Sequence, residues 1–148
     1  MSHSLTPTQQ RHRSYLFITA FVVGSFGPIF TLGTMASTSG LATWALDLLN
    51  WPLDGAQNFA APTTRFLSAL TGGFLFGWGM MIVGLRLWVY DLAPEGVRKA
   101  ILLGLCSWFV LDSLGSVLAE APSNVAFNVV VLLLAVGPLW RSGATEAN

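Results

Sequence analysis

Four long apolar blocks constrain this chain more than any other feature of its sequence. Each block holds roughly 20 residues with few charges, enough for an α-helix to cross the hydrocarbon core of a bilayer. Only 9% of the 148 residues are charged and 53% are apolar, whereas soluble domains carry about 25% charged residues. The sequence therefore predicts an all-α, polytopic membrane protein that folds as a small bundle of four transmembrane helices. We place the four spans at about 15–34, 64–90, 100–119 and 123–140.

The remaining segments divide the chain into one domain and two tails. Residues 1–14 and 142–148 are polar and are expected to be tails, and residues 15–141 form a single transmembrane domain. Lysine and arginine gather in alternate connections, which by the positive-inside rule face the cytoplasm. The residues on that side are Arg11, Arg13, Arg86, Arg98, Lys99 and Arg141. Because the first outer loop has only Arg65 and the second has no basic residue, both termini are predicted to be cytoplasmic.

The long first outer loop contains a short amphipathic segment. Leu41, Trp44, Ala45 and Leu48 recur at helical spacing before Pro52, which predicts a short interfacial helix. Such a helix is either a surface anchor or a lid over a cavity. Indole rings prefer the headgroup region, and on this ground four tryptophans are expected at the two membrane interfaces. They are Trp44, Trp51, Trp88 and Trp140.

The first apolar block allows two interpretations. Pro28 lacks an N–H and should kink a spanning helix there. The alternative is a secretory signal, because Arg11 and Arg13 precede the block and Thr34-Met35-Ala36 resembles a small-residue cleavage site. The block is longer than the usual apolar core of a signal peptide, so we favour a retained span.

The second predicted span is rich in glycine. Ala69, Gly73 and Gly77 repeat every four residues, a pattern of small residues that lets another helix backbone approach closely. We expect this stripe to pack against a helix of the same bundle. The alternative is a seam between two copies of the chain.

Polar residues at predicted membrane depth indicate where a site would lie. An acid inside a transmembrane segment is rare and is a functional-site hypothesis by default, and Asp112 occupies such a position. Residues four apart share a helix face, so Asn124 and Asn128 should point the same way on the next helix. The predicted topology brings six residues toward one outward-facing pocket: Arg65, Asp112, Ser113, Ser116, Asn124 and Asn128.

Two interpretations of this cluster remain open. Hydrogen bonds between polar side chains of neighbouring membrane helices can simply stabilise a bundle, at roughly 0.6–2 kcal/mol each. Alternatively, the cluster is an outward-facing site for a lipid headgroup, a polar small molecule or a proton.

Other classes of function lack the residues they need. The net charge is zero, whereas a nucleic-acid partner requires a basic face. His3 and His12 both fall in the predicted N-terminal tail, and Cys106 is the sole cysteine, so we expect neither a metal site nor a cofactor. Asp112 has no neighbouring base or second acid that would complete a catalytic set, so we expect no enzymatic activity.

The sequence thus favours a structural or accessory subunit that binds another membrane protein or a second copy of itself within the lipid bilayer. The alternative is a small transporter, or a protein that binds a lipid or small molecule in the pocket around Asp112. By analogy, its length and topology suggest a multi-pass protein of the bacterial inner membrane.

Overall fold

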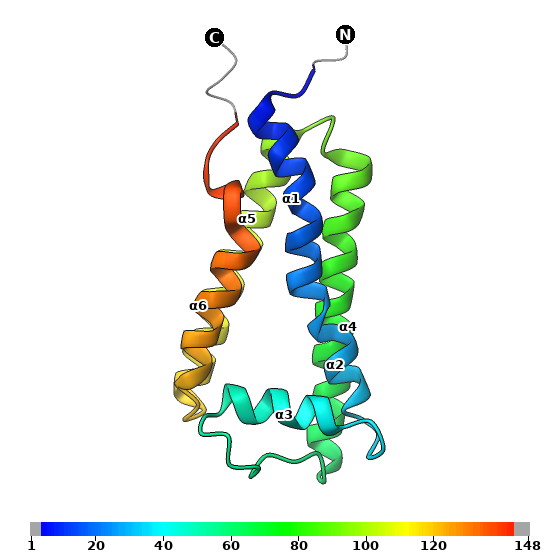
Figure 1. Cartoon of the computed structure of the whole chain (residues 1–148), viewed down its shortest axis with the longest axis vertical. Helices are drawn as coiled ribbons and strands as arrows, with labels where there is room; N and C mark the ends of the chain where they lie inside the picture. The colour runs from blue at the N-terminus through cyan, green and yellow to red at the C-terminus, as the bar shows by residue number, and fades with distance from the viewer. Residues whose placement is uncertain (1–3, 144–148) are drawn as a thin grey trace.

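The computed structural model describes residues 4–143, and these residues form a helical bundle (Figure 1). Its elements are α1 Pro7–Gly24, α2 Phe26–Leu32, α3 Gly40–Leu49, α4 Pro62–Gly84, the π-helical turn η1 Leu85–Val89, α5 Pro94–Leu118, α6 Ser123–Val136 and the 3₁₀ turn η2 Gly137–Trp140. Within the described range, four stretches are long and apolar enough to cross a membrane, namely α1–α2, α4–η1, α5 and α6–η2. The predicted all-α fold is confirmed, and the four stretches suggest a multi-pass membrane protein.

The first helix begins at Pro7, eight residues before the predicted span. Thr6 and Gln9 form a capping box, in which each side chain accepts a hydrogen bond from the backbone N–H of the other, at 3.2 and 3.0 Å. Proline is favoured at the first helical position. The helix is therefore started by polar capping residues beyond the apolar block, and residues 7–14 are not a separate tail. The helix is interrupted at Ser25, between α1 and α2 and three residues before Pro28, where the sequence predicts a kink.

Helices α1 and α2 pack along α4 through glycines. A Cβ added at Gly79 would lie 2.7 Å from Gly24 Cα, and one added at Gly72 would lie 2.6 Å from the carbonyl oxygen of Gly27. Both distances are shorter than van der Waals contact, so only glycine permits this approach. The Ser68 hydroxyl adds a hydrogen bond of 2.6 Å to the Phe30 carbonyl.

The expected packing of the Ala69–Gly73–Gly77 stripe inside the bundle is therefore wrong. Gly73 and Gly77 are exposed, and a Cβ at either would meet no atom within 4 Å. Both faces of α4 carry small residues at suitable spacing, and only the partner helix decides which face is used. Gly73 and Gly77 contact no other helix of the single chain, so a seam with another copy or another protein stays a prediction.

The bundle is tight at one end and open at the other. Helix α5 packs mainly on α6, and this pair joins α1 through contacts near η2. The buried core lies toward the end where α1 begins and η2 ends, hereafter the terminal end (Figure 1). Its members are Leu16, Ala20, Val23, Ile82, Tyr90, Val97, Ile101, Leu105, Ala135, Val136 and Leu139. The helices form two pairs, one of α1–α2 with α4 and the other of α5 with α6. At the opposite end, hereafter the α3 end, α3 lies across the space between these two helix pairs (Figure 1).

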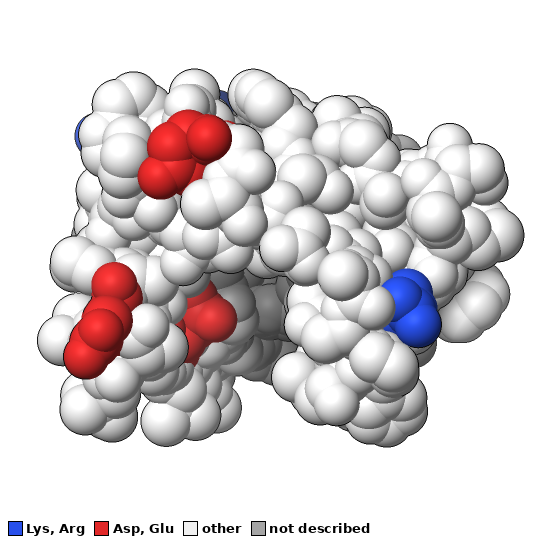
Figure 2. Space-filling model, turned by 90° about the horizontal axis from the view of Figure 1, so that it is seen from below, with Lys and Arg blue, Asp and Glu red and all other residues white. Residues whose placement is uncertain are grey.

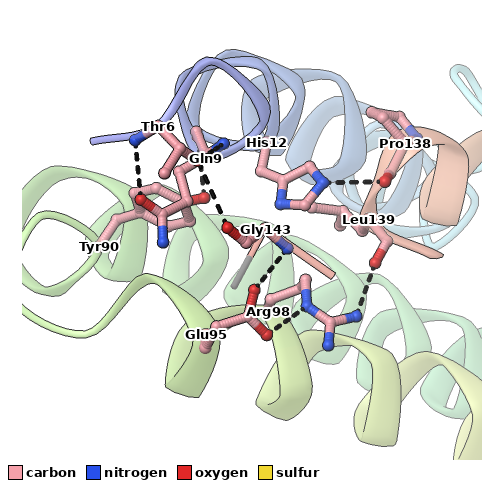
Figure 3. A network of polar contacts seen from close by, with 9 residues as sticks. All are labelled: Thr6, Gln9, His12, Tyr90, Glu95, Arg98, Pro138, Leu139 and Gly143. Carbon is pink, nitrogen blue, oxygen red and sulfur yellow. Dashed lines mark hydrogen bonds and ion pairs between the residues drawn. The ribbon is translucent and has the colours of Figure 1, made fainter. Parts of the chain in front are cut away.

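A polar network closes the terminal end (Figure 3). Arg98 donates from Nε to Glu95 Oε2 at 2.8 Å and from a terminal guanidinium nitrogen to the Leu139 carbonyl at 2.9 Å. The fully buried Tyr90 donates its hydroxyl to the Gln9 carbonyl at 2.9 Å. Because burial disfavours a phenolate, it raises the pKa of Tyr90 to about 12. The network joins α1, α5 and the chain after α6.

Candidate functional site

The candidate site is a cluster of side chains between α5 and α6 near the α3 end. Asp112 Oδ2 accepts a hydrogen bond of 3.0 Å from Asn124 Nδ2 and one of 2.6 Å from Asn128 Nδ2. Asn128 is 2% exposed, whereas Asp112 and Asn124 are half-buried. The side chains that helical spacing assigned to one place therefore do meet, with the carboxylate as the shared acceptor.

Two serines complete the cluster. Asn124 Nδ2 also donates to Ser116 Oγ at 2.8 Å, and Asn128 Nδ2 donates to Ser113 Oγ at 3.3 Å. The Ser116 hydroxyl in turn donates to the Asp112 backbone carbonyl at 2.7 Å. Each asparagine thus binds the acid and one serine, which holds both amide groups in a fixed orientation.

The turn between α5 and α6 sets this register. Glu120 adopts a left-handed backbone with φ of 58°, and the N–H of Ala121 bonds the Ser116 carbonyl at 2.9 Å. This closes α5 in the manner of a helix C-cap, and α6 begins only a few residues later. The Ser123 hydroxyl at the start of α6 makes no capping hydrogen bond and donates to the Leu49 carbonyl at 2.6 Å. That bond fixes the end of α3 to the start of α6.

The cluster forms part of the wall of a cavity of about 180 Å³ between the two helix pairs. The lining residues are Val23, Phe26, Phe30, Leu49, Thr71, Leu75, Trp78, Trp108, Asp112, Asn124, Phe127, Asn128 and Val131. Figure 2, which looks at the α3 end, shows a deep hollow with an acidic side chain on its wall. Leu49 is the contribution of α3, so α3 covers one side of the cavity as a lid would. Asp112 is the one formally charged group of the lining.

Aromatic side chains form much of the cavity wall, and none of them is among the site residues predicted from the sequence. Trp78 on α4 and Trp108 on α5 meet edge to face, with ring centroids 6.4 Å apart. Phe26 and Phe127 form a second edge-to-face pair at 5.9 Å. A signal was present in the sequence, because Trp78 and Trp108 fall in the middle of their spans, away from the interfaces that tryptophan prefers.

Arg65 does not belong to the cluster, contrary to expectation. Its guanidinium donates to the carbonyls of Phe59 and Ala60, at 3.0 and 2.7 Å. It lines a separate depression at the α3 end, together with residues such as Thr34 and Asn58. The carbonyls of the loop just before α4 lie closer to Arg65 along the chain than any acid does, and they take up its donors.

The four tryptophans expected at interfaces are all exposed. Trp88 and Trp140 end their helical stretches at the terminal end, and Trp44 lies in α3 with Trp51 just after it. Exposed indoles therefore occur at both ends of the bundle, which is the arrangement of an aromatic belt.

His12 lies in α1 and not in a polar tail. It is 1% exposed, its Nε2 lies 2.9 Å from the Pro138 carbonyl, and its Nδ1 has no hydrogen-bond partner in the described structure. Among residues 4–143, no group of three or more histidine, cysteine or acidic side chains is placed to hold a metal ion.

Comparison with protein-family models, with curated proteins and with solved structures finds no match to this chain.

Proposed function

We propose that this protein is a non-catalytic membrane protein that binds a small amphipathic molecule in the cavity beside Asp112. The observation that carries the proposal is the position of the cluster. Asp112, Asn124 and Asn128 join α5 to α6 and also form one wall of a cavity. The rest of the lining is apolar apart from one threonine hydroxyl and two indole N–H groups. A concave apolar site with a few convergent polar groups is the usual form of a small-molecule site.

We propose that this site lies in the outer half of a bacterial inner membrane protein whose termini are cytoplasmic. Support for this orientation comes from the basic residues, which gather near the terminal end. Asp112 lies six residues before the end of α5, or about 9 Å from the α3 end of the helix. A ligand would therefore reach the carboxylate from the outer leaflet or from the outer solution.

Binding is favoured over catalysis by the composition of the lining. Asp112 is its only titratable side chain, so the lining offers no separate acid and base to share a proton-transfer step. Ser116 Oγ is already occupied by Asn124 and the Asp112 carbonyl. We infer that the acid positions a ligand and performs no bond-breaking step.

The test is native mass spectrometry of the protein gently extracted from its own membrane. One or two protomers with a bound small molecule would support the proposal and give the mass of the ligand. The matched variants are Val131→Phe, which places a ring in the cavity, and Val130→Phe on the exposed neighbouring face of α6. Loss of the bound mass in both variants, or in neither, would count against binding in this cavity.

A second candidate is an accessory subunit that binds another membrane protein. It is favoured by the face of α4 that carries Gly73 and Gly77, which is open in the single chain. Gly77→Leu should release a co-purifying protein, whereas Gly115→Leu, at an equally open glycine of α5, should not. A native mass that includes no second polypeptide would count against this candidate.

A further inference from the structure

On the basis of the cavity function proposed above, the surroundings of Asp112 indicate the charge of the ligand. The two carboxylate oxygens of Asp112 are not equivalent. Oδ2 accepts both asparagine amides, whereas Oδ1 accepts no hydrogen bond from any residue in the described range 4–143. Oδ1 is also not sealed among protein atoms, and Asp112 lines the cavity. One oxygen is thus fixed in place by protein donors while the other is left for a group inside the cavity.

The hydrogen atoms of both amides are already used within the cluster. Asn124 gives its two N–H groups to Asp112 and Ser116, and Asn128 gives its two to Asp112 and Ser113. The amide oxygens of the same asparagines remain as acceptors. The cluster therefore has no amide hydrogen left to donate, and what it can still offer a ligand is oxygen acceptors, which require a donor from the ligand.

No positively charged side chain among residues 4–143 forms an ion pair with the carboxylate. The cavity lining contains no lysine, arginine or histidine, and the arginine expected beside Asp112 is bonded to the carbonyls of Phe59 and Ala60. An uncompensated carboxylate at membrane depth is costly. The remaining donors in the lining are neutral, namely the Thr71 hydroxyl and two indole N–H groups, so they do not remove that cost.

The aromatic lining suits the same kind of ligand. Ring faces attract organic cations, and Trp78, Trp108, Phe26 and Phe127 all line the cavity with Asp112. The volume of about 180 Å³ sets the size, because an apolar cavity of about 150 Å³ holds one benzene molecule. The enclosed part of the ligand is therefore small.

We propose that the ligand is a small organic cation, an ammonium group on a short apolar stem, with its charge against Asp112 Oδ1 and its stem among the rings of Trp78, Trp108 and Phe127. A lipid with an ammonium headgroup and a free amine share this chemistry. The mass found in native extraction distinguishes the two sources.

The experiment compares three probes of similar size and different charge: benzylammonium, benzyl alcohol and benzoate. Binding to the full chain in a neutral maltoside detergent is measured by saturation-transfer NMR and titration of tryptophan fluorescence. The wild type should prefer the cation. Asp112→Asn should weaken cation binding by about 10- to 100-fold, and Glu120→Gln, which removes an acid outside the cavity lining, should leave it unchanged.

Equal binding of the cation by Asp112→Asn and the wild type, or equal binding of the three probes, overturns the cation assignment. If Asp112→Asn fails to fold by circular dichroism, Trp108→Phe replaces it, and this variant should lose more affinity for the cation than for benzyl alcohol. Benzyl alcohol binding that is blocked by Val131→Phe, without preference for the cation, refutes the charge assignment and leaves the cavity function intact. Absence of binding by all three probes refutes both.

Discussion

The close approach of α1 to α4 gives the sharpest prediction about stability. Gly79→Ala should destabilise the protein, and Gly77→Ala, two residues away, should not. A Cβ at position 79 would lie 2.7 Å from Gly24 Cα and 2.9 Å from the Ala20 carbonyl oxygen, whereas a Cβ at position 77 would meet nothing within 4 Å. The atoms met at position 79 belong to the backbone, so they cannot give way by a change of rotamer.

The magnitude follows from the distances. Carbon atoms pack at about 3.5–4.0 Å, so the alanine at position 79 would require the two helices to separate by about 1 Å. Overpacking of this kind costs about 1–3 kcal/mol. Alanine also gains up to about 1 kcal/mol over glycine in a helix, but this gain is shared by both variants. The free energy of unfolding should therefore be lower in Gly79→Ala than in Gly77→Ala by about 1–3 kcal/mol.

The assay is a denaturant titration in detergent, followed by far-ultraviolet circular dichroism, on both variants and the wild type. Gly24→Ala provides a further graded case. Its Cβ would lie 3.4 Å from Gly79 Cα, so the loss should be smaller than for Gly79→Ala. If Gly79→Ala were as stable as Gly77→Ala, the assignment of the inner and outer faces of α4 would be refuted.

Three further predictions concern single side chains. Asn128→Leu should lower the free energy of unfolding by about 1–3 kcal/mol, because it leaves the half-buried Asp112 with one amide donor. Burial raises the pKa of Tyr90 to about 12, so Tyr90 should ionise only near pH 12. The measurement is the tyrosinate absorbance at about 295 nm, with the Tyr90→Phe variant subtracted to isolate the signal of Tyr90. Because the pKa of Tyr90 is higher in the folded state than the unfolded value of about 10, the folded state favours the protonated phenol. The contribution of this phenol to the free energy of unfolding is therefore complete below pH 10 and is lost as the pH rises to 12. Glu120→Gly should raise stability by up to about 1 kcal/mol, because φ at Glu120 is 58°.

Each of these predictions has its own control or contrary result. Val129→Leu changes an exposed neighbour of Asn128 and should have little effect, so equal losses in the two variants would contradict the role of the amide. A Tyr90 signal with a midpoint near pH 10 would mean that the phenol is not buried. A loss of stability in Glu120→Gly would contradict the strain assigned to the turn.

Local features of the sequence predicted the helices but not all of their limits. The length and hydropathy of the four blocks are sufficient to identify spans, and the recurrence of Leu41, Trp44 and Leu48 predicted α3, observed at Gly40–Leu49. The start of α1 was misplaced because polarity was taken to end the helix, whereas a capping box at Thr6 starts it earlier. Hydropathy reports the solvent around a helix, while capping residues report where the helix begins.

The candidate site was predictable where it depends on neighbours along the chain. Asp112, Asn124 and Asn128 lie on consecutive helices joined by a tight turn, so spacing and a single turn determine their contact. Arg65 was misassigned because its position relative to Asp112 depends on how the two helix pairs are arranged, which the sequence does not encode locally. The same reason explains why Gly73 was chosen in place of Gly72.

The two ends of the bundle differ in what joins the helix pairs, and the proposed ligand would bind at the more open end. Buried side chains and the Arg98–Glu95 network join the helix pairs at the terminal end, whereas near the α3 end the cavity separates them. There the pairs are linked by edge-to-face rings, Trp78 with Trp108 and Phe26 with Phe127, and by the hydrogen bond from α6 to the end of α3. A molecule in contact with Asp112 and with the rings would touch both helix pairs at once. Because it binds only the assembled cavity, it would stabilise the folded bundle by mass action, and mainly in the half that the protein core leaves open.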